Sequence, residues 1–210
     1  MASEDLPANG HGGPADPPAQ VRKQDLRRVL RAARANYVAG LTLAQHERLR
    51  ADLISILYAN LPVGGVGQPP CIVAGYAPRG SEIDPGPCDL FPYVGGNNGL
   101  TFHRCTRVEL VPGYADIAEP PADALAVDPD VILVPLIAVD ARGTRLGQGA
   151  GHYDRTLAAL RARRPVLAVG IAWDMQQVED LRADPWDEHL DALATPSRWL
   201  TFARIIHRRD

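Results

Sequence analysis

The chain has 210 residues, 46% of them hydrophobic and 22% charged, which is ordinary for one globular domain. Its formal net charge of −3 gives no overall positive field, and no apolar run approaches the ~20 residues of a membrane helix, so we expect neither nucleic-acid nor membrane partners. The three cysteines do not pair evenly and lack zinc-site spacing, and no basic-then-apolar signal pattern is present, so the expected location is cytoplasmic.

The first 20 residues are rich in Pro, Gly and Ala, which predicts a disordered tail before a single domain over residues 21–210. Residues 21–37 predict an amphipathic helix, because apolar residues recur every three or four positions: Leu26, Val29, Leu30, Ala33 and Tyr37. Cations recur every four residues on another face, at Lys23, Arg27 and Arg31. Such a stripe is either a solvated surface or a face directed at a polyanion.

A second helix is expected over residues 42–60, where Thr42 and Gln45 fit a capping box. Its buried face is expected to hold Leu49, Leu53, Ile56 and Leu57. Short apolar runs separated by Gly and Pro then predict strands over residues 71–77, 90–94 and 100–104, with a loop at 78–87 and an irregular stretch at 110–128.

The most apolar run, residues 130–140, predicts a strand buried on both faces, as in a parallel sheet. A helix over 154–164 and a strand over 165–173 complete a right-handed βαβ unit, and residues 200–206 predict a last strand. Ligands of such sheets bind beyond the carboxyl ends of the strands. We therefore expect three features at that edge, namely Asp140, the glycine loop after it, and Trp173 with Asp174.

The loop RLGQGAGHYDRTL, residues 145–157, has glycine at three alternate positions and leads into a helix. Backbone N–H groups of such a loop commonly cradle phosphate oxygens, although a tight turn without ligand is the alternative. No Gly-Lys-Ser/Thr follows, and His152 stands where the dinucleotide fingerprint needs glycine. Arg145 suits a phosphate clamp, and Asp154 suits either a helix cap or a Mg²⁺ ligand.

Residues 130–157 resemble the signature of the 5-formyltetrahydrofolate cyclo-ligase family, an apolar strand followed by Asp-x-x-Gly-x-Arg-Leu-Gly-x-Gly-x-Gly-Tyr-Tyr-Asp-Arg. The matching positions are Asp140, Gly143, Arg145, Leu146, Gly147, Gly149, Gly151, Tyr153, Asp154 and Arg155. KQDLR at residues 23–27 and SEID at 81–84 resemble two further family segments, and 169–197 resembles the C-terminal block that ends in a strand and Thr-Pro.

The resemblance covers about residues 21–200, with a poorly matching stretch between residues 91 and 120. Two positions inside the central motif depart from the family pattern. Gln148 stands where many members have arginine, and His152 replaces Tyr or Phe.

The resemblance implies an α/β fold, a three-layer sandwich around a mostly parallel central sheet with helices on both faces. It implies an ATP- and Mg²⁺-dependent conversion of 5-formyltetrahydrofolate to 5,10-methenyltetrahydrofolate with release of ADP and phosphate. The formyl oxygen would be phosphorylated, and N10 would then close the ring. We expect a monomer or a weak homodimer.

The residue roles carried over by the resemblance fall into four sets. Residues expected to bind ATP are Lys23, Arg27, Arg145, Leu146, Gly147, Gln148, Gly149, Ala150, Gly151, His152 and Tyr153. Lys23, Arg145 and Asp154 are expected to act in catalysis, Asp154 and Asp187 to ligate Mg²⁺, and Ala77 and Glu82 to bind the folate. Two rival interpretations are another ATP-dependent enzyme on the same scaffold and a non-catalytic folate- or nucleotide-binding module.

Overall fold

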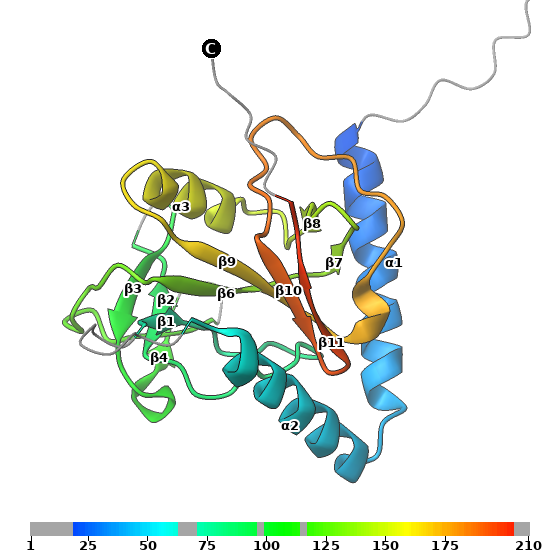
Figure 1. Ribbon diagram of the computed structural model, residues 1–210, viewed down its shortest axis with the longest axis horizontal. Helices are drawn as coiled ribbons and strands as arrows, with labels where there is room; N and C mark the ends of the chain where they lie inside the picture. Colours follow the sequence, from blue (N-terminus) through cyan, green and yellow to red (C-terminus); the bar gives the residue numbers. More distant parts are fainter. Residues whose placement is uncertain (1–18, 63–70, 96–98, 114–116, 204–210) are drawn as a thin grey trace, which may run out of the picture.

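The computed structural model describes residues 19–62, 71–95, 99–113 and 117–203 (Figure 1). The predicted disordered tail lies almost wholly outside these residues, as does the end of the strand predicted over residues 200–206. Among the described helices, none combines the length and the apolar character that crossing a bilayer requires.

Both N-terminal helices form where the sequence predicts them, as α1 (Ala19–Ala39) and α2 (Leu43–Asn60). Thr42 caps α2, and its capping box with Gln45 is complete. Leu53 and Leu57 of α2 are buried in the core, as expected.

The apolar stripe predicted for α1 is only partly right. Leu26 and Val29 are 36% and 52% exposed, whereas Arg34 is buried. The reason is that α1 stands beside the sheet, next to the hairpin of β7 (Ala138–Val139) and β8 (Arg145–Leu146) (Figure 1), and turns its cations toward the body of the protein.

The central sheet has seven strands in the order β11-β10-β9-β6-β1-β2-β3. Their bounds are β1 (Val73–Ala74), β2 (Leu90–Tyr93), β3 (Thr101–Arg104), β6 (Val131–Pro135), β9 (Leu167–Ile171), β10 (Ala192–Thr195) and β11 (Arg198–Thr201). The inner neighbours pair in parallel, and β3 and β11 pair antiparallel at the two edges. The predicted βαβ unit is confirmed, because α3 (His152–Arg161) joins the parallel neighbours β6 and β9.

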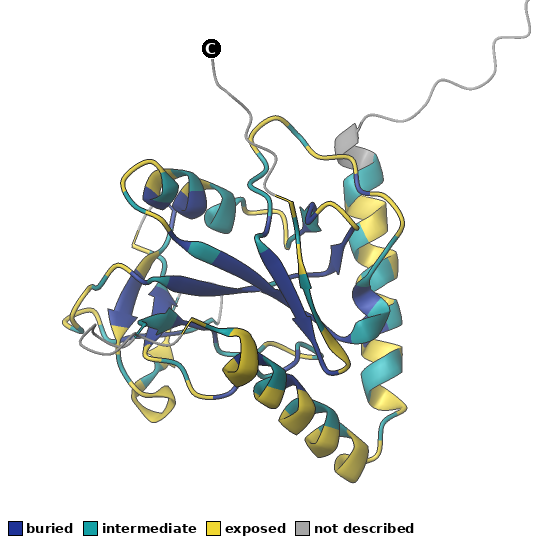
Figure 2. Ribbon diagram, in the orientation of Figure 1, coloured by how far each residue is buried: buried dark blue, intermediate teal, exposed yellow. Residues whose placement is uncertain are grey.

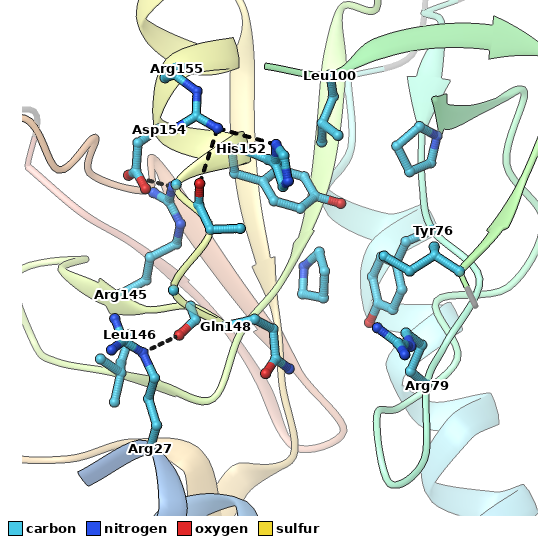
Figure 3. A pocket seen from close by; sticks show the side chains of 18 of the residues that line it. Arg27, Tyr76, Arg79, Leu100, Arg145, Leu146, Gln148, His152, Asp154 and Arg155 are labelled. Atoms are coloured by element: carbon cyan, nitrogen blue, oxygen red, sulfur yellow. Dashed lines mark hydrogen bonds and ion pairs between the residues drawn. The ribbon is translucent and has the colours of Figure 1, made fainter. Parts of the chain in front are cut away.

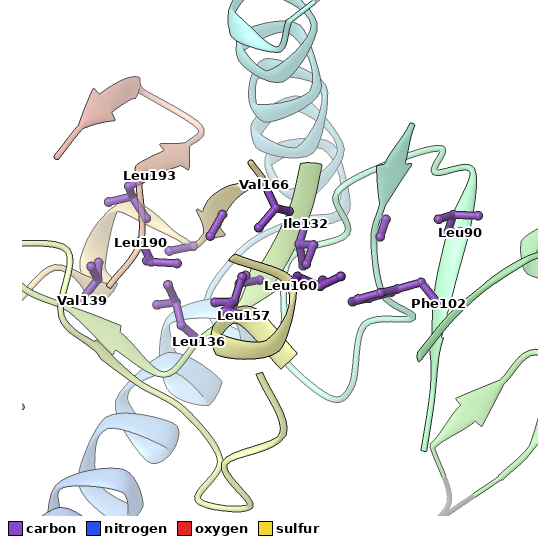
Figure 4. Packing of buried hydrophobic residues seen from close by; sticks show 14 residues of the cluster. Leu90, Phe102, Ile132, Leu136, Val139, Leu157, Leu160, Val166, Leu190 and Leu193 are labelled. Atoms are coloured by element: carbon purple, nitrogen blue, oxygen red, sulfur yellow. The ribbon is translucent and has the colours of Figure 1, made fainter. Parts of the chain in front are cut away.

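Helices cover both faces of this sheet, so the predicted three-layer α/β fold is confirmed (Figure 1). Alternate residues of β6 point to opposite faces. Ile132 and Val134 belong to the core cluster that contains Leu157 and Leu160 of α3 (Figure 4), while Val131 and Leu133 belong to the cluster on the α2 side. The central strands are accordingly the most buried part of the chain (Figure 2).

The single strand predicted over residues 130–140 is two strands, β6 and β7 (Ala138–Val139). The chain leaves the sheet at Leu136, whose carbonyl accepts hydrogen bonds from Arg34 and Gln176 instead of a neighbouring strand. β7 then pairs antiparallel with β8 (Arg145–Leu146), and this hairpin positions the glycine loop.

The remaining short elements connect these layers. They are the 3₁₀ turns η1 (Arg107–Glu109) and η3 (Asp174–Gln176) and the strand pair β4 (Val111–Pro112) and β5 (Ala118–Glu119). The stretch expected to be irregular over residues 110–128 therefore contains a small two-stranded sheet.

Candidate functional site

A cavity of about 1330 Å³ opens beyond the carboxyl ends of β1 and β6, where Ala77 and Pro135 line it (Figure 3). Every residue assigned to ATP, folate or metal from the sequence lines this one cavity, although the assignments came from four separate segments. These are Lys23, Arg27, Ala77, Glu82, Arg145, Leu146, Gly147, Gln148, Gly149, Ala150, Gly151, His152, Tyr153, Asp154 and Asp187.

The glycine loop forms one wall of the cavity. Gly149 and Gly151 have φ angles of +108° and +67°, in the left-handed region that side chains disfavour. A Cβ at Gly149 would also lie 3.4 Å from the guanidinium carbon of Arg27. Gly151 begins α3 without a side-chain cap, so the first turn of that helix, with its positive dipole end, borders the cavity. The loop therefore has the form of an anion cradle.

Three cations that the sequence assigns to ATP line the cavity near the loop, two from α1 and one from β8. Lys23 Nζ lies 2.7 Å from Asp184 Oδ2 and 3.0 Å from Asp187 Oδ2. Burial lowers the pKa of Lys23, but the hydrogen bonds to both aspartates outweigh it and the net pKa is raised. Arg27 Nε donates to Gly147 O at 2.9 Å, and burial lowers the pKa of Arg27.

Arg145 is the third cation, and its side chain is 5% exposed. Its Nη2 donates to Asp154 Oδ1 at 2.6 Å, and its Nη1 donates to Glu188 O. The backbone N–H of Glu188 donates to the same oxygen of Asp154 at 3.1 Å. Figure 3 shows this pair beside Leu146 and Arg27 on one side of the cavity.

The carboxylates of Asp154 and Asp187 both line the cavity, and carboxylate oxygen is the ligand type that Mg²⁺ prefers. Each carboxylate is already paired with a cation. Within the described ranges there is no group of three or more His, Cys, Asp or Glu that could hold a metal. The residues therefore fit a Mg²⁺ that takes one or two protein oxygens and completes its shell with phosphate and water, not an all-protein cage.

The opposite side of the cavity combines one carboxylate with apolar surface. Glu82 is 7% exposed at its side chain, and its Oε2 accepts from Arg79 N at 3.0 Å. The Tyr76 hydroxyl donates to Ile83 O at 2.8 Å, and burial together with Glu82 raises the pKa of that phenol well above its usual value. Pro92, Val94, Leu100 and Ile117 supply the apolar wall. Such a wall suits a flat heterocyclic ring.

Gln148 stands between the two sides (Figure 3). Its Oε1 accepts from Arg31 Nε at 2.9 Å, while its Nε2 donates to Glu82 Oε1 at 3.2 Å. An amide can accept and donate at once, whereas an arginine at this position could only donate. The departure from the family pattern thus links α1 to the loop that carries Glu82.

His152, the second departure, lies at the start of α3. Its Nδ1 is 3.2 Å from Arg155 Nη2, and burial with that neighbouring charge lowers the pKa of the imidazole. Tyr153 packs against the α3-side core, and burial raises the pKa of its hydroxyl.

Trp173 and Asp174 follow the carboxyl end of β9, as expected, but neither they nor Asp140 are among the described residues that line the cavity. Asp140 is 3% exposed and accepts from the backbone N–H groups of its own turn. Trp173 is fully buried against Tyr37, with ring centroids 5.8 Å apart, and Asp174 accepts from Ser197. These residues stabilise the fold behind the site.

Several lining residues escaped the sequence analysis. They include Tyr76, Arg79, Leu100, Asp184 and the 66%-exposed Trp186. Asp184 lies three residues before Asp187, across a tight turn, and this spacing could have indicated that both carboxylates reach the cavity. The apolar wall falls in the stretch that matched the family motifs poorly.

Residues 100–196 match the model of the 5-formyltetrahydrofolate cyclo-ligase family. The chain is 41% identical over 114 residues to 5-formyltetrahydrofolate cyclo-ligase of Escherichia coli K12, which covers 52% of this chain and 61% of the relative. It is 39% identical over 99 residues to the enzyme of that name from Mycolicibacterium smegmatis, and this match covers 45% of this chain and 50% of the relative. The matches thus span between half and about three-fifths of these relatives.

Two solved structures are similar over nearly their whole length. The NMR structure of 5,10-methenyltetrahydrofolate synthetase from Aquifex aeolicus matches with a TM-score of 0.66 and 29% identity, covering 90% of this chain and 99% of that one. A structure of the synthetase from Mycoplasma pneumoniae has the same fold, with a TM-score of 0.61, 23% identity and coverage of 83% and 98%.

Proposed function

We propose that the chain, which matches the model of the 5-formyltetrahydrofolate cyclo-ligase family over residues 100–196, belongs to that family, and that it converts 5-formyltetrahydrofolate to 5,10-methenyltetrahydrofolate and consumes ATP in doing so. One observation carries the proposal. A single cavity holds a cationic phosphate cradle on one side and a buried carboxylate with an apolar wall on the other, so both substrates could meet in it.

The chemistry needs positioning more than it needs a protein nucleophile. The formyl oxygen attacks the γ-phosphorus, the bond to the bridging β–γ oxygen breaks, and ADP leaves. N10 then adds to the formyl carbon and loses its proton, and inorganic phosphate departs with the former formyl oxygen. The positive charge of the product is shared between N5 and N10.

On the nucleotide side, Lys23, Arg27 and Arg145 would hold the triphosphate together with the amides of the glycine loop. Their charges would neutralise the oxygens of the transferred group, which is the main contribution a protein makes to phosphoryl transfer. Mg²⁺ held by Asp154 and Asp187 would supply further neutralisation of the phosphate oxygens. These residues line the same cavity, where Lys23 pairs with Asp187 and Arg145 with Asp154, and this supports the assignment.

On the folate side, Glu82 would accept hydrogen bonds from N–H groups of the pterin, and Ala77 would border the same ring. The apolar wall that contains Leu100 and Ile117 would cover the face of the ring and exclude water. The proposal includes a cytoplasmic location, since the reaction consumes ATP and a reduced folate.

The test is a mixing experiment with the purified protein, ATP, Mg²⁺ and 5-formyltetrahydrofolate. We expect the near-ultraviolet absorbance of the methenyl product to grow in step with ADP, and to require both substrates. ADP release that ignores the folate would favour another ATP-dependent enzyme on this scaffold. Binding of both ligands without product would favour a non-catalytic module, and either result would refute the proposal.

A further inference from the structure

Arg34 is the one buried residue among the described side chains of α1, at 5% exposure. The rest of that helix is exposed or half-buried. Burial lowers the pKa of this guanidinium, because a charge loses hydration when it leaves water. A buried charge is retained only where partners compensate for that loss, so the partners of Arg34 show what it does.

Those partners lie on two segments that border the cavity, the end of β6 and the loop that carries Glu82. Arg34 Nη1 donates to Leu136 O at 3.1 Å, where the chain leaves β6, and Nε donates to Ser81 Oγ at 3.0 Å. Nη1 also lies 3.9 Å from Glu82 Oε1. Arg34 is not among the described residues that line the cavity, whereas Glu82 is. The guanidinium therefore stands behind the carboxylate, on the side away from a ligand.

Glu82 is held from three directions. Besides Arg34, its Oε2 accepts from Arg79 N at 3.0 Å and its Oε1 accepts from Gln148 Nε2 at 3.2 Å. The contact with Arg34 is an ion pair, whereas the other two are hydrogen bonds from uncharged N–H groups, and both members of the ion pair are almost fully buried, at 6% and 7% side-chain exposure. Removing the guanidinium would take a buried positive charge from beside the carboxylate and leave the hydrogen bonds from Arg79 N and Gln148 Nε2 to hold its orientation.

We propose that Arg34 is a positioning residue of the folate subsite, which fixes the carboxylate of Glu82 in the orientation that receives the N–H groups of the pterin. The inference rests on the proposed function, because it takes the ligand of Glu82 to be the folate. Arg34 acts through Glu82 and touches neither substrate. Its loss should therefore affect the folate and leave ATP binding nearly unchanged.

The experiment compares Arg34→Gln, Arg34→Lys, Glu82→Gln and the double variant Arg34→Gln/Glu82→Gln. Each is characterised by the dissociation constant for 5-formyltetrahydrofolate from calorimetry, by KM for each substrate and by thermal unfolding. Arg28→Gln is the matched control, since Arg28 lies on the same helix with its side chain 75% exposed. If Arg34→Gln does not fold, Ser81→Ala replaces it in the comparison, because it removes only the hydroxyl that accepts from Arg34 Nε.

We expect Arg34→Gln to weaken folate binding about tenfold or more, as truncating one member of a buried charge pair does, with KM for ATP within about twofold. Arg34→Lys should recover part of the loss. The double variant should bind folate little worse than Glu82→Gln alone, because both changes disable the same carboxylate. Ser81→Ala should show a smaller loss confined to the folate.

Three results would overturn the inference. They are folate binding unchanged in Arg34→Gln or Ser81→Ala, equal losses for ATP and folate, or losses that add fully in the double variant. The last two would show a structural role only. Failure of the proposed function is a separate result: a wild-type protein that binds the folate but forms no methenyl product refutes the reaction, while the binding constants still decide on Arg34.

Discussion

Asp154→Asn tests the metal assignment and the architecture of the site together. From sequence alone this substitution is expected to slow turnover and to leave folding almost intact. The structure adds a second role, because Asp154 Oδ1 is the acceptor for Arg145 at 2.6 Å and for the backbone of Glu188 at 3.1 Å. The side chain of Arg145 is 5% exposed, so its counter-charge matters to stability.

The two effects have different sizes. Asparagine keeps an acceptor oxygen but loses the charge, which turns a charge-assisted hydrogen bond into a neutral one and costs about 1–2 kcal/mol. For a chain of this size that corresponds to a fall in Tm of about 2–8 °C. Loss of a Mg²⁺ ligand removes several kcal/mol of charge stabilisation, which at 1.36 kcal/mol per factor of ten predicts a drop in kcat of about 10²- to 10³-fold.

The assay is methenyl formation at saturating substrates over a Mg²⁺ titration, with thermal unfolding of the same samples. Asp52→Asn is the control, an aspartate of α2 with its side chain 50% exposed, and it should match the wild type in both measurements. Wild-type turnover in Asp154→Asn would refute the metal assignment. An unchanged Tm would refute the argument that this carboxylate stabilises Arg145.

Lys23→Ala should raise KM for ATP about tenfold or more and leave KM for the folate nearly unchanged, because a charged donor to phosphate is lost. Equal rises for both substrates would instead indicate misfolding. Gly149→Ala, at φ +108°, should lower the free energy of unfolding in urea by about 1 kcal/mol or more, whereas a Cβ at Gly147 meets nothing within 4 Å and should cost far less. Equal losses of stability in Gly149→Ala and Gly147→Ala would contradict the argument that the positive φ angle at residue 149 requires glycine. Burial raises the pKa of Asp140, but the hydrogen bonds from Arg142, Leu181 and Thr144 outweigh it, so the folded pKa lies below 3.8. Asp140→Asn should therefore lower the free energy of unfolding by about 2–4 kcal/mol at pH 7, and the gap between the variant and the wild type should shrink as the pH falls through the folded pKa. The matched control Asp180→Asn changes an exposed carboxylate and should alter stability little. A stability gap for Asp140→Asn that does not depend on pH would contradict this reasoning.

The parts of the site that the sequence predicts well each have a local signature. Alternating glycines before a helix produce positive φ angles and an uncapped helix start within a few residues, as Gly149 and Gly151 show. The four-residue spacing of Lys23 and Arg27 places both on one face of a helix whatever the rest of the fold is. Local patterns of this kind keep their meaning in any tertiary context.

The failures concern residues whose role depends on distant segments. The apolar stripe predicted for α1 includes Val29, yet Val29 is 52% exposed, because α1 stands beside the sheet (Figure 1). The break after β6 depends on Leu136 O finding donors on α1 and η3, which no local pattern of the apolar run reveals. Asp140 follows an apolar run at the edge where ligands are expected, but its carboxylate accepts hydrogen bonds from Thr144 N of its own turn and from Leu181 N.

The attachment of α1 bears on how tightly any triphosphate can bind. Lys23 holds Asp184 and Asp187, and Arg27 holds a carbonyl of the glycine loop, so the cations that face the cavity also secure the helix. A phosphate that reaches Lys23 competes with two carboxylates, and its measured affinity is the difference between the new contacts and the broken ones. Arg34 lies outside that competition, because its partners are internal to the protein. Its contacts with Ser81 and Leu136 can therefore persist while the other cations exchange an internal anion for a ligand.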